Sequence, residues 1–168
     1  MTLYIDGDAL PKVAKELLIK AINRTQTPTV FVANSFLSLP KVPYLSLVVV
    51  EQGFDVADEY IATRAGVGDI VITSDIPLAH AALDNGAWVM SAWGVVFDVN
   101  TIGSRRAVRD LMDNLRSTGV LTQAQMGGQP PYSNKDKKQF ADALNRLLDK
   151  HKKHPNNQSP TFMERLQV

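Results

Sequence analysis

Aspartates follow several apolar stretches of this sequence at spacings that could bring carboxylates together. Asp6 directly follows the stretch 3–5, and Asp8 comes two residues later. In an extended segment, side chains at this spacing project toward the same face. Asp55 and Asp58 are three residues apart and would share a face in the first turn of a helix. Hard divalent cations bind one or two carboxylates, keep several waters and take further oxygens from phosphate. Such a cluster would suit metal-assisted attack of water on a phosphodiester.

Each of these acids also has a structural interpretation. Asp8, Asp55 and Asp75 precede expected helices, where an Asp side chain commonly caps the first turn. Asp6 differs, because a carboxylate at the end of a buried strand is costly unless it is paired or bound to a cation. Asp69 precedes an expected strand, so we interpret it as a turn residue and leave it out of the candidate site.

The elements that must position these acids alternate between strand and helix. Apolar runs with little alternation predict strands buried on both faces, and apolar residues at helical spacing predict the helices between them. This order predicts an α/β fold with a doubly wound, mainly parallel sheet, which binds ligands beyond the carboxyl ends of the strands. The expected strands are 2–5, 29–33, 45–50, 69–73 and 87–90, and the expected helices are 9–23, 55–65, 77–86, 101–119 and 133–150.

Composition limits the possible classes of protein. The 168 residues predict one domain, at 1–150, followed by a polar C-terminal tail at 151–168. The absence of cysteine excludes a disulfide framework, a thiolate zinc site and a cysteine nucleophile. No apolar run approaches the length of a membrane span and no export signal is expected, which favours a cytoplasmic protein without a membrane partner. P-loop, GxGxxG and GxSxG motifs are missing.

Basic residues gather in the second half of the chain. Arg105, Arg109 and Arg116 share the expected helix 101–119, and more Lys and Arg than Asp follow at 134–154. Such a helix is often simply a solvated face, but arginine also suits phosphate contacts to nucleic acid. Residues 122–132 form a Gly/Pro/Gln segment longer than an ordinary connection, which raises the alternative of a binding loop.

Several motifs together give a resemblance to a known family. They are D-G-D-A-L-P at 6–11, G-F-D-V-A-D at 53–58, G-D-I-V-I-T-S-D-I-P-L-A at 68–79, Arg109-Asp110 and Leu115-Arg116. Over residues 1–150 the chain resembles the YaiI/YqxD family of small bacterial proteins, whose domain is PIN-like. The resemblance implies a three-layer α/β/α sandwich with acids gathered at the strand ends. PIN-like relatives include metal-dependent ribonucleases, which implies Mg²⁺ or Mn²⁺ as cofactor and single-stranded RNA as substrate.

The resemblance also implies roles for individual residues. Asp6 and Asp75 would be catalytic, and Ser74 would support them at the substrate. The loop segment that begins at Gly127 and Gly128 also resembles a family motif and would lie on the substrate side with Lys135. Asp6, Asp8, Asp55, Asp58 and Asp75 would face the metal. The sequence departs from the family at two positions. Leu10 replaces a common cysteine, so a thiol is not essential to the chemistry here, and Trp93 replaces a common arginine, so the guanidinium that would contact phosphate at that position is missing.

Three functions compete at this point. The first is a metal-dependent endoribonuclease-like phosphodiesterase, in which aspartates activate water and Arg105, Arg109, Arg116 or Lys135 contact phosphates. The second is a non-catalytic module that binds nucleic acid or protein. The third is an aspartyl phosphotransferase, suggested by the strand followed by Asp-x-Asp, but its Gly-Asp motif should follow the Thr-Ser motif, and here Gly68-Asp69 precedes Thr73-Ser74. The oligomeric state is left open.

Overall fold

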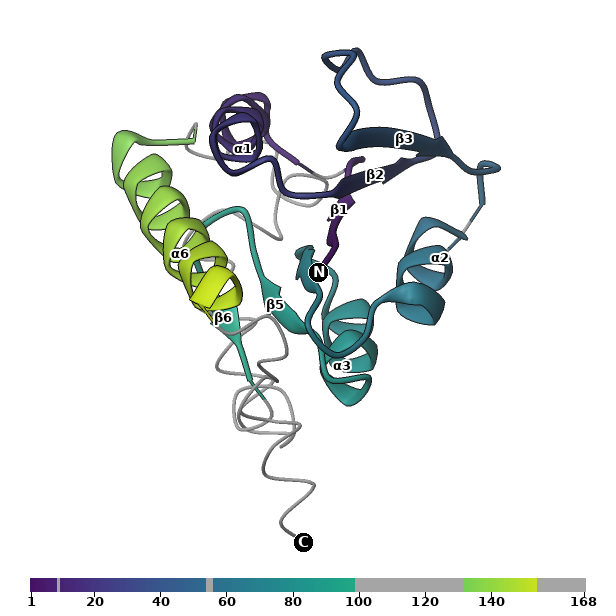
Figure 1. Cartoon of the computed structure of the whole chain (residues 1–168). Coiled ribbons are helices and arrows are strands. Elements are labelled where there is room, and N and C mark those ends of the chain that lie inside the picture. Colours follow the sequence, from purple (N-terminus) through teal and green to yellow (C-terminus); the bar gives the residue numbers. More distant parts are fainter. Residues whose placement is uncertain (9, 54–55, 99–131, 154–168) are drawn as a thin grey trace, which may run out of the picture.

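The computed structural model describes residues 1–8, 10–53, 56–98 and 132–153, and Figure 1 shows how their helices and strands are arranged. Several predictions therefore lie outside the described residues. These are the roles of Asp55, Arg105, Arg109, Arg116, Gly127 and Gly128, the helix at 101–119, and the part of the predicted tail at 154–168.

A single sheet of six strands organises the described chain, in the order β3-β2-β1-β4-β5-β6. The first five strands are parallel, and β6 runs antiparallel to β5. The strand order reverses direction between β1 and β4, as the doubly wound arrangement requires. The predicted α/β class with a mainly parallel sheet is confirmed. The strands are β1 (Leu3–Asp6), β2 (Thr29–Ala33), β3 (Leu45–Val49), β4 (Ile70–Ile72), β5 (Trp88–Met90) and β6 (Val96–Phe97).

Helices cover both faces of this sheet. In Figure 1, α1 (Lys12–Thr25) and α6 (Asn134–Lys153) lie on one side, and α2 (Val56–Arg64) and α3 (Ile76–Asp84) lie on the other. The helix α6 continues three residues past the expected domain end at 150. None of the described helices has both the length and the apolar character needed to cross a membrane.

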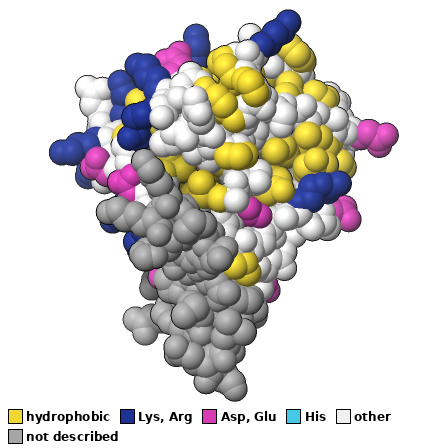
Figure 2. Space-filling model, viewed as in Figure 1, with side chains coloured by type: hydrophobic (Ala, Val, Ile, Leu, Met, Phe, Trp, Pro, Cys, Tyr) yellow, Lys and Arg dark blue, Asp and Glu magenta, His cyan; other side chains and the backbone are white. Residues whose placement is uncertain are grey.

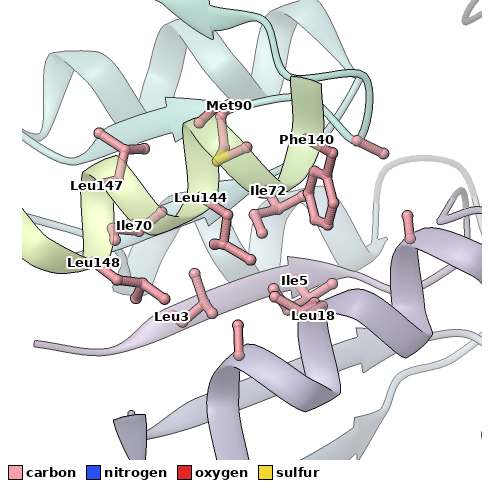
Figure 3. Packing of buried hydrophobic residues seen from close by; sticks show 14 of the residues in the cluster. Leu3, Ile5, Leu18, Ile70, Ile72, Met90, Phe140, Leu144, Leu147 and Leu148 are labelled. Atoms are coloured by element: carbon pink, nitrogen blue, oxygen red, sulfur yellow. The ribbon is translucent and has the colours of Figure 1, made fainter. Parts of the chain in front are cut away.

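Two hydrophobic cores result, one on each face. The first, under α1 and α6, contains Leu3 and Ile5 of β1, Leu18 of α1 and the apolar stripe of α6, as Figure 3 shows. The members from α6 are Phe140, Ala143, Leu144, Leu147 and Leu148. The second core lies under α2 and α3 and is built around Ile61, Leu78 and Val89. Because both faces of β1, β4 and β5 are covered, these strands are almost continuously apolar.

The strand β6 was not expected from the sequence. A tight turn after β5 reverses the chain, with the Ser91 N–H donating to the Val95 carbonyl at 2.8 Å and Gly94 at φ 84°. A side chain at Gly94 would also collide with α6, since an added Cβ would lie 2.5 Å from the backbone carbonyl of Gln139. The turn thus serves as the contact point on which the backbone of α6 rests.

The expectation that Asp8 caps the first helix is wrong. α1 begins at Lys12, three residues later than predicted, and Pro11 occupies the N-cap position with extended backbone and no side-chain cap. Both Asp8 oxygens instead accept the backbone N–H of Asn34, at 2.9 and 3.1 Å. The carboxylate therefore ties the segment after β1 to the end of β2.

Candidate functional site

The candidate site lies at the carboxyl edge of the sheet, where the strand order reverses. Asp6 is the last residue of β1, and the register that pairs Ile5 with Ile72 brings it beside Thr73, directly after β4. The Thr73 hydroxyl donates to Asp6 Oδ2 at 3.2 Å and accepts the Asp75 N–H at 3.0 Å. One threonine thus links the two aspartates that the sequence singled out as catalytic.

Asp75 also has a structural role, as a helix cap. Its Oδ1 accepts the Leu78 N–H at 2.8 Å, which makes it the N-cap of α3, with Pro77 in the first turn. The capping interpretation of Asp75 is confirmed. An ionised carboxylate offers about four acceptor positions, so capping does not exhaust its capacity to bind a further group.

The carboxyl group of Asp6 is electrostatically strained. The pKa of Asp6 is raised to about 6, with burial as the largest cause. The negative charges of Asp8 and Asp75 also raise it, whereas hydrogen bonds from Thr73 and from the backbone of Asp8 lower it. Asp8 and Asp75 therefore both lie close enough to act on Asp6. The balance leaves a carboxylate that is mostly ionised at neutral pH but close to its titration range.

Glycine at position 7 allows the close approach that shapes this edge. The Gly7 N–H donates to the Val32 carbonyl at 2.9 Å, and an added Cβ would lie 3.2 Å from that oxygen and 2.9 Å from the tip of Leu37. The tight contact holds the segment between Asp6 and Asp8 against the end of β2. The two acids are thereby held at the same edge of the sheet.

The other predicted site residues differ in what the structure shows. Ser74 lies half-buried between Thr73 and Asp75. Asp58 is half-buried in the first turn of α2, the helix that packs on β1 and β2. Lys135 is exposed in the first turn of α6. In the described ranges, no group of three or more Asp, Glu, His or Cys side chains has a geometry that could hold a metal ion.

Asp69 lies at the opposite, amino edge of the sheet. Its Oδ1 accepts the Thr2 N–H at 2.8 Å and its Oδ2 accepts the Gly66 N–H at 3.0 Å. These bonds fix the turn before β4, in agreement with the interpretation of Asp69 as a turn residue.

Two residues of the site were not identified from the sequence. Thr73 was predicted to end a strand and to belong to a Thr-Ser motif, and no role was predicted for Asn34. The signal for Thr73 was present, because a hydroxyl at the end of the strand beside β1 must lie next to Asp6. The contact of Asn34 with Asp8 spans 26 residues of sequence and could only come from the folded chain.

A doubly wound α/β protein with paired acids at its topological switch point is the class that this fold and edge define. The chain belongs to the uncharacterized YaiI/YqxD family, whose model matches residues 4–150. It is 49% identical to a UPF0178 protein of Psychrobacter cryohalolentis over 148 residues, covering 88% of this chain and 99% of the relative. A UPF0178 protein of Pseudoalteromonas translucida is 44% identical over 152 residues, with 90% and 99% covered. No solved structure shows significant similarity to the chain.

Proposed function

We propose that this protein is a divalent-metal-dependent phosphodiesterase of the PIN-like kind that cleaves single-stranded RNA. The observation that carries the proposal is the link through Thr73 between Asp6 and Asp75 at the switch point of the sheet, with the pKa of Asp6 raised to about 6. Sheets of this type bind ligands at this place. Carboxylates that repel one another are relieved by a bound cation, and their oxygens are the ligands that Mg²⁺ and Mn²⁺ prefer.

The donor set fits such a cation in a particular way. Mg²⁺ needs only one or two protein carboxylates when substrate phosphate and water complete its shell. Asp6 and Asp75 supply two, and each retains acceptor positions beyond its hydrogen bonds to Thr73 and Leu78. When bound, the metal would lower the pKa of a coordinated water and neutralise charge on the phosphate.

A carboxylate of the protein would take the proton of the attacking water. Asp6 is ionised at neutral pH, and its oxygen that does not hold the cation can accept a proton from the attacking water. Water oxygen would form the new bond to phosphorus while the bond to the leaving ribose oxygen breaks, and that oxygen would take its proton from solvent. Asp75, fixed by its cap, would hold the second carboxylate in place.

Cleavage of a labelled single-stranded RNA in millimolar Mn²⁺ tests the proposal. Asp75→Asn is a sharp variant, because asparagine caps a helix as well as aspartate does and removes only the charge. We expect Asp6→Asn and Asp75→Asn to abolish cleavage with unchanged circular dichroism, and Asp142→Asn on the exposed face of α6 to retain it. Cleavage that persists equally in all three variants would refute the assignment.

A second candidate is a binding module in which the acids have only structural roles. It is favoured because two of the acids already have structural hydrogen bonds: Asp8 accepts the Asn34 N–H and Asp75 accepts the Leu78 N–H. Calorimetry separates the two candidates. Mn²⁺ binding that disappears in Asp6→Asn supports the phosphodiesterase, whereas no heat at millimolar metal, with or without RNA, supports the module.

A further inference from the structure

The described helices on the two faces of the sheet carry opposite net charge. Among the described side chains, α2 and α3 carry three acids and one Arg or Lys, namely Asp58, Glu59 and Asp84 against Arg64. The layer of α1 and α6 has the reverse balance. Its basic residues are Lys12, Lys15, Lys20, Arg24, Lys135, Lys137, Lys138, Arg146 and Lys150, and its acids are Glu16, Asp136, Asp142 and Asp149. Figure 2 shows dark blue Lys and Arg side chains gathered over the side where α1 and the start of α6 lie.

A hydrogen bond fixes which side chains line the boundary between these helices. Arg24 Nη2 donates to Asn145 Oδ1 at 2.6 Å. Lys20 lies one helical turn before Arg24 and Lys138 lies two turns before Asn145, so each shares the face of the residue that makes this bond. We call these four residues the α1/α6 seam. All four are exposed.

Both helices begin at the edge of the sheet that carries Asp6. α1 follows the carboxyl end of β1, and the start of α6 is held there by the Tyr132 hydroxyl, which donates to the Ala92 carbonyl beyond β5 at 2.6 Å. At the far end, Leu148 of α6 and Arg24 of α1 line one cavity of about 350 Å³ with Pro28, which precedes β2. The helices therefore run in the same direction, and the α1/α6 seam leads toward the acidic edge.

Among the described residues, the two lysines of the seam have no acidic partner. Within the described part of the chain, the ion pair that the structure shows is His80 with Asp84 on α3, so none involves Lys20 or Lys138. Lys20 and Arg24 lie about 6 Å apart along the helix axis, at 1.5 Å per residue. A row of such cations recognises repeated phosphates independently of base sequence.

We propose that the α1/α6 seam binds the phosphate backbone of single-stranded RNA through Lys20, Arg24 and Lys138 and guides it to the acidic edge. The inference rests on the proposed function, because it assigns the surface that holds the substrate. An acidic protein is the competing partner for a basic surface. RNA is favoured because the seam leads to carboxylates suited to a phosphodiester.

Binding is measured without cleavage, by fluorescence anisotropy of a labelled single-stranded RNA in EDTA at low salt. Lys20→Glu and Lys138→Glu reverse exposed charges of the seam, and Lys41→Glu reverses an exposed charge in the loop before β3, with the same change in net charge. We expect each seam variant to weaken binding about fivefold or more, and to reduce the slope of log affinity against log salt by about 0.7 per lost phosphate contact. Lys41→Glu should bind as the wild type does.

Other results would either overturn the role of the seam or separate it from the proposed function. Equal weakening by all three variants, no RNA binding by the wild type, or displacement of RNA by an equal concentration of poly-glutamate would overturn the inference. Binding that depends on the seam, without any metal-dependent cleavage, would support the inference and refute the phosphodiesterase. Cleavage that remains normal in Lys20→Glu and Lys138→Glu would support the phosphodiesterase and refute the role of the seam.

Discussion

The Thr73 hydroxyl at the end of β4 donates to Oδ2 of Asp6 at the end of β1, across 3.2 Å and 67 residues of sequence. The same hydroxyl oxygen accepts the Asp75 N–H. This residue therefore partly offsets the cost of placing a charged carboxylate in a half-buried position.

Thr73→Val tests this offset, because valine keeps the shape and removes the hydroxyl. A hydrogen bond to the charged form lowers a carboxyl pKa, so its loss should move the pKa of Asp6 further above the wild-type value of about 6. Carboxyl-carbon NMR titration measures the shift. Thr63→Val on α2 is the control, since that hydroxyl bonds to helix carbonyls of Glu59 and Tyr60. An unchanged Asp6 pKa in Thr73→Val would contradict the role given to the hydroxyl.

The raised pKa of Asp6 should make stability depend on pH. The folded state holds the Asp6 proton more tightly than the unfolded chain, whose value is near 3.8. The resulting stabilisation is complete below pH 3.8, is lost as the pH rises to about 6, and amounts to about 3 kcal/mol for a shift of this size. Asp6→Asn should remove this component, which urea unfolding at a series of pH values measures. If the free energy of unfolding changed with pH in the same way in the wild type and the variant, the raised pKa of Asp6 would be contradicted.

Above the pKa of Asp6, a bound cation should offset the destabilisation caused by the partly buried negative charge. Mn²⁺ stabilises the folded state when it binds ionised carboxylates, so it should raise the melting temperature at pH 8 more than at pH 5. Asp6→Asn should remove the difference between the two pH values, and Asp142→Asn should preserve it. An equal rise in all proteins would indicate metal binding elsewhere on the surface.

Gly94 should be intolerant of any side chain. Gly94→Ala requires a positive φ of 84° and places a Cβ 2.5 Å from the Gln139 carbonyl, which together should cost about 3 kcal/mol. Gly66→Ala is a matched control, since its Cβ would make only ordinary contact, 3.7 Å from the Asn85 carbonyl. Denaturant unfolding compares the two. A stable Gly94→Ala protein would show that α6 does not rest on this turn.

Much of the fold could be predicted from the sequence because its signals are local. Apolar runs such as 70–72 and the capping residue Asp75 define their own elements, and the alternation of strands and helices defines the sheet. The position of Asp6 at the switch point follows from that alternation. Family membership, expected from several ordered motifs, is confirmed.

The parts that could not be predicted depend on contacts between distant segments. An aspartate at position 8 could equally well cap a helix or accept a hydrogen bond from a distant segment. The position of Asn34 in the folded chain determines which of the two occurs. β6 has two residues, too few to give a periodic pattern, and Gly94 was its one clear signal. The raised pKa of Asp6 needs burial and two neighbouring charges, neither of which a sequence pattern measures.

The two cores differ in when their residues leave the ribosome. The described members of the core under α2 and α3 all come from the first 97 residues, ending with Phe97. The core under α1 cannot be completed until Phe140 to Leu148 have been synthesised. During translation, the face of β1 and α1 that α6 later covers would stay open to water and to chaperones. The synthesis of α6 therefore sets when this core becomes fully native.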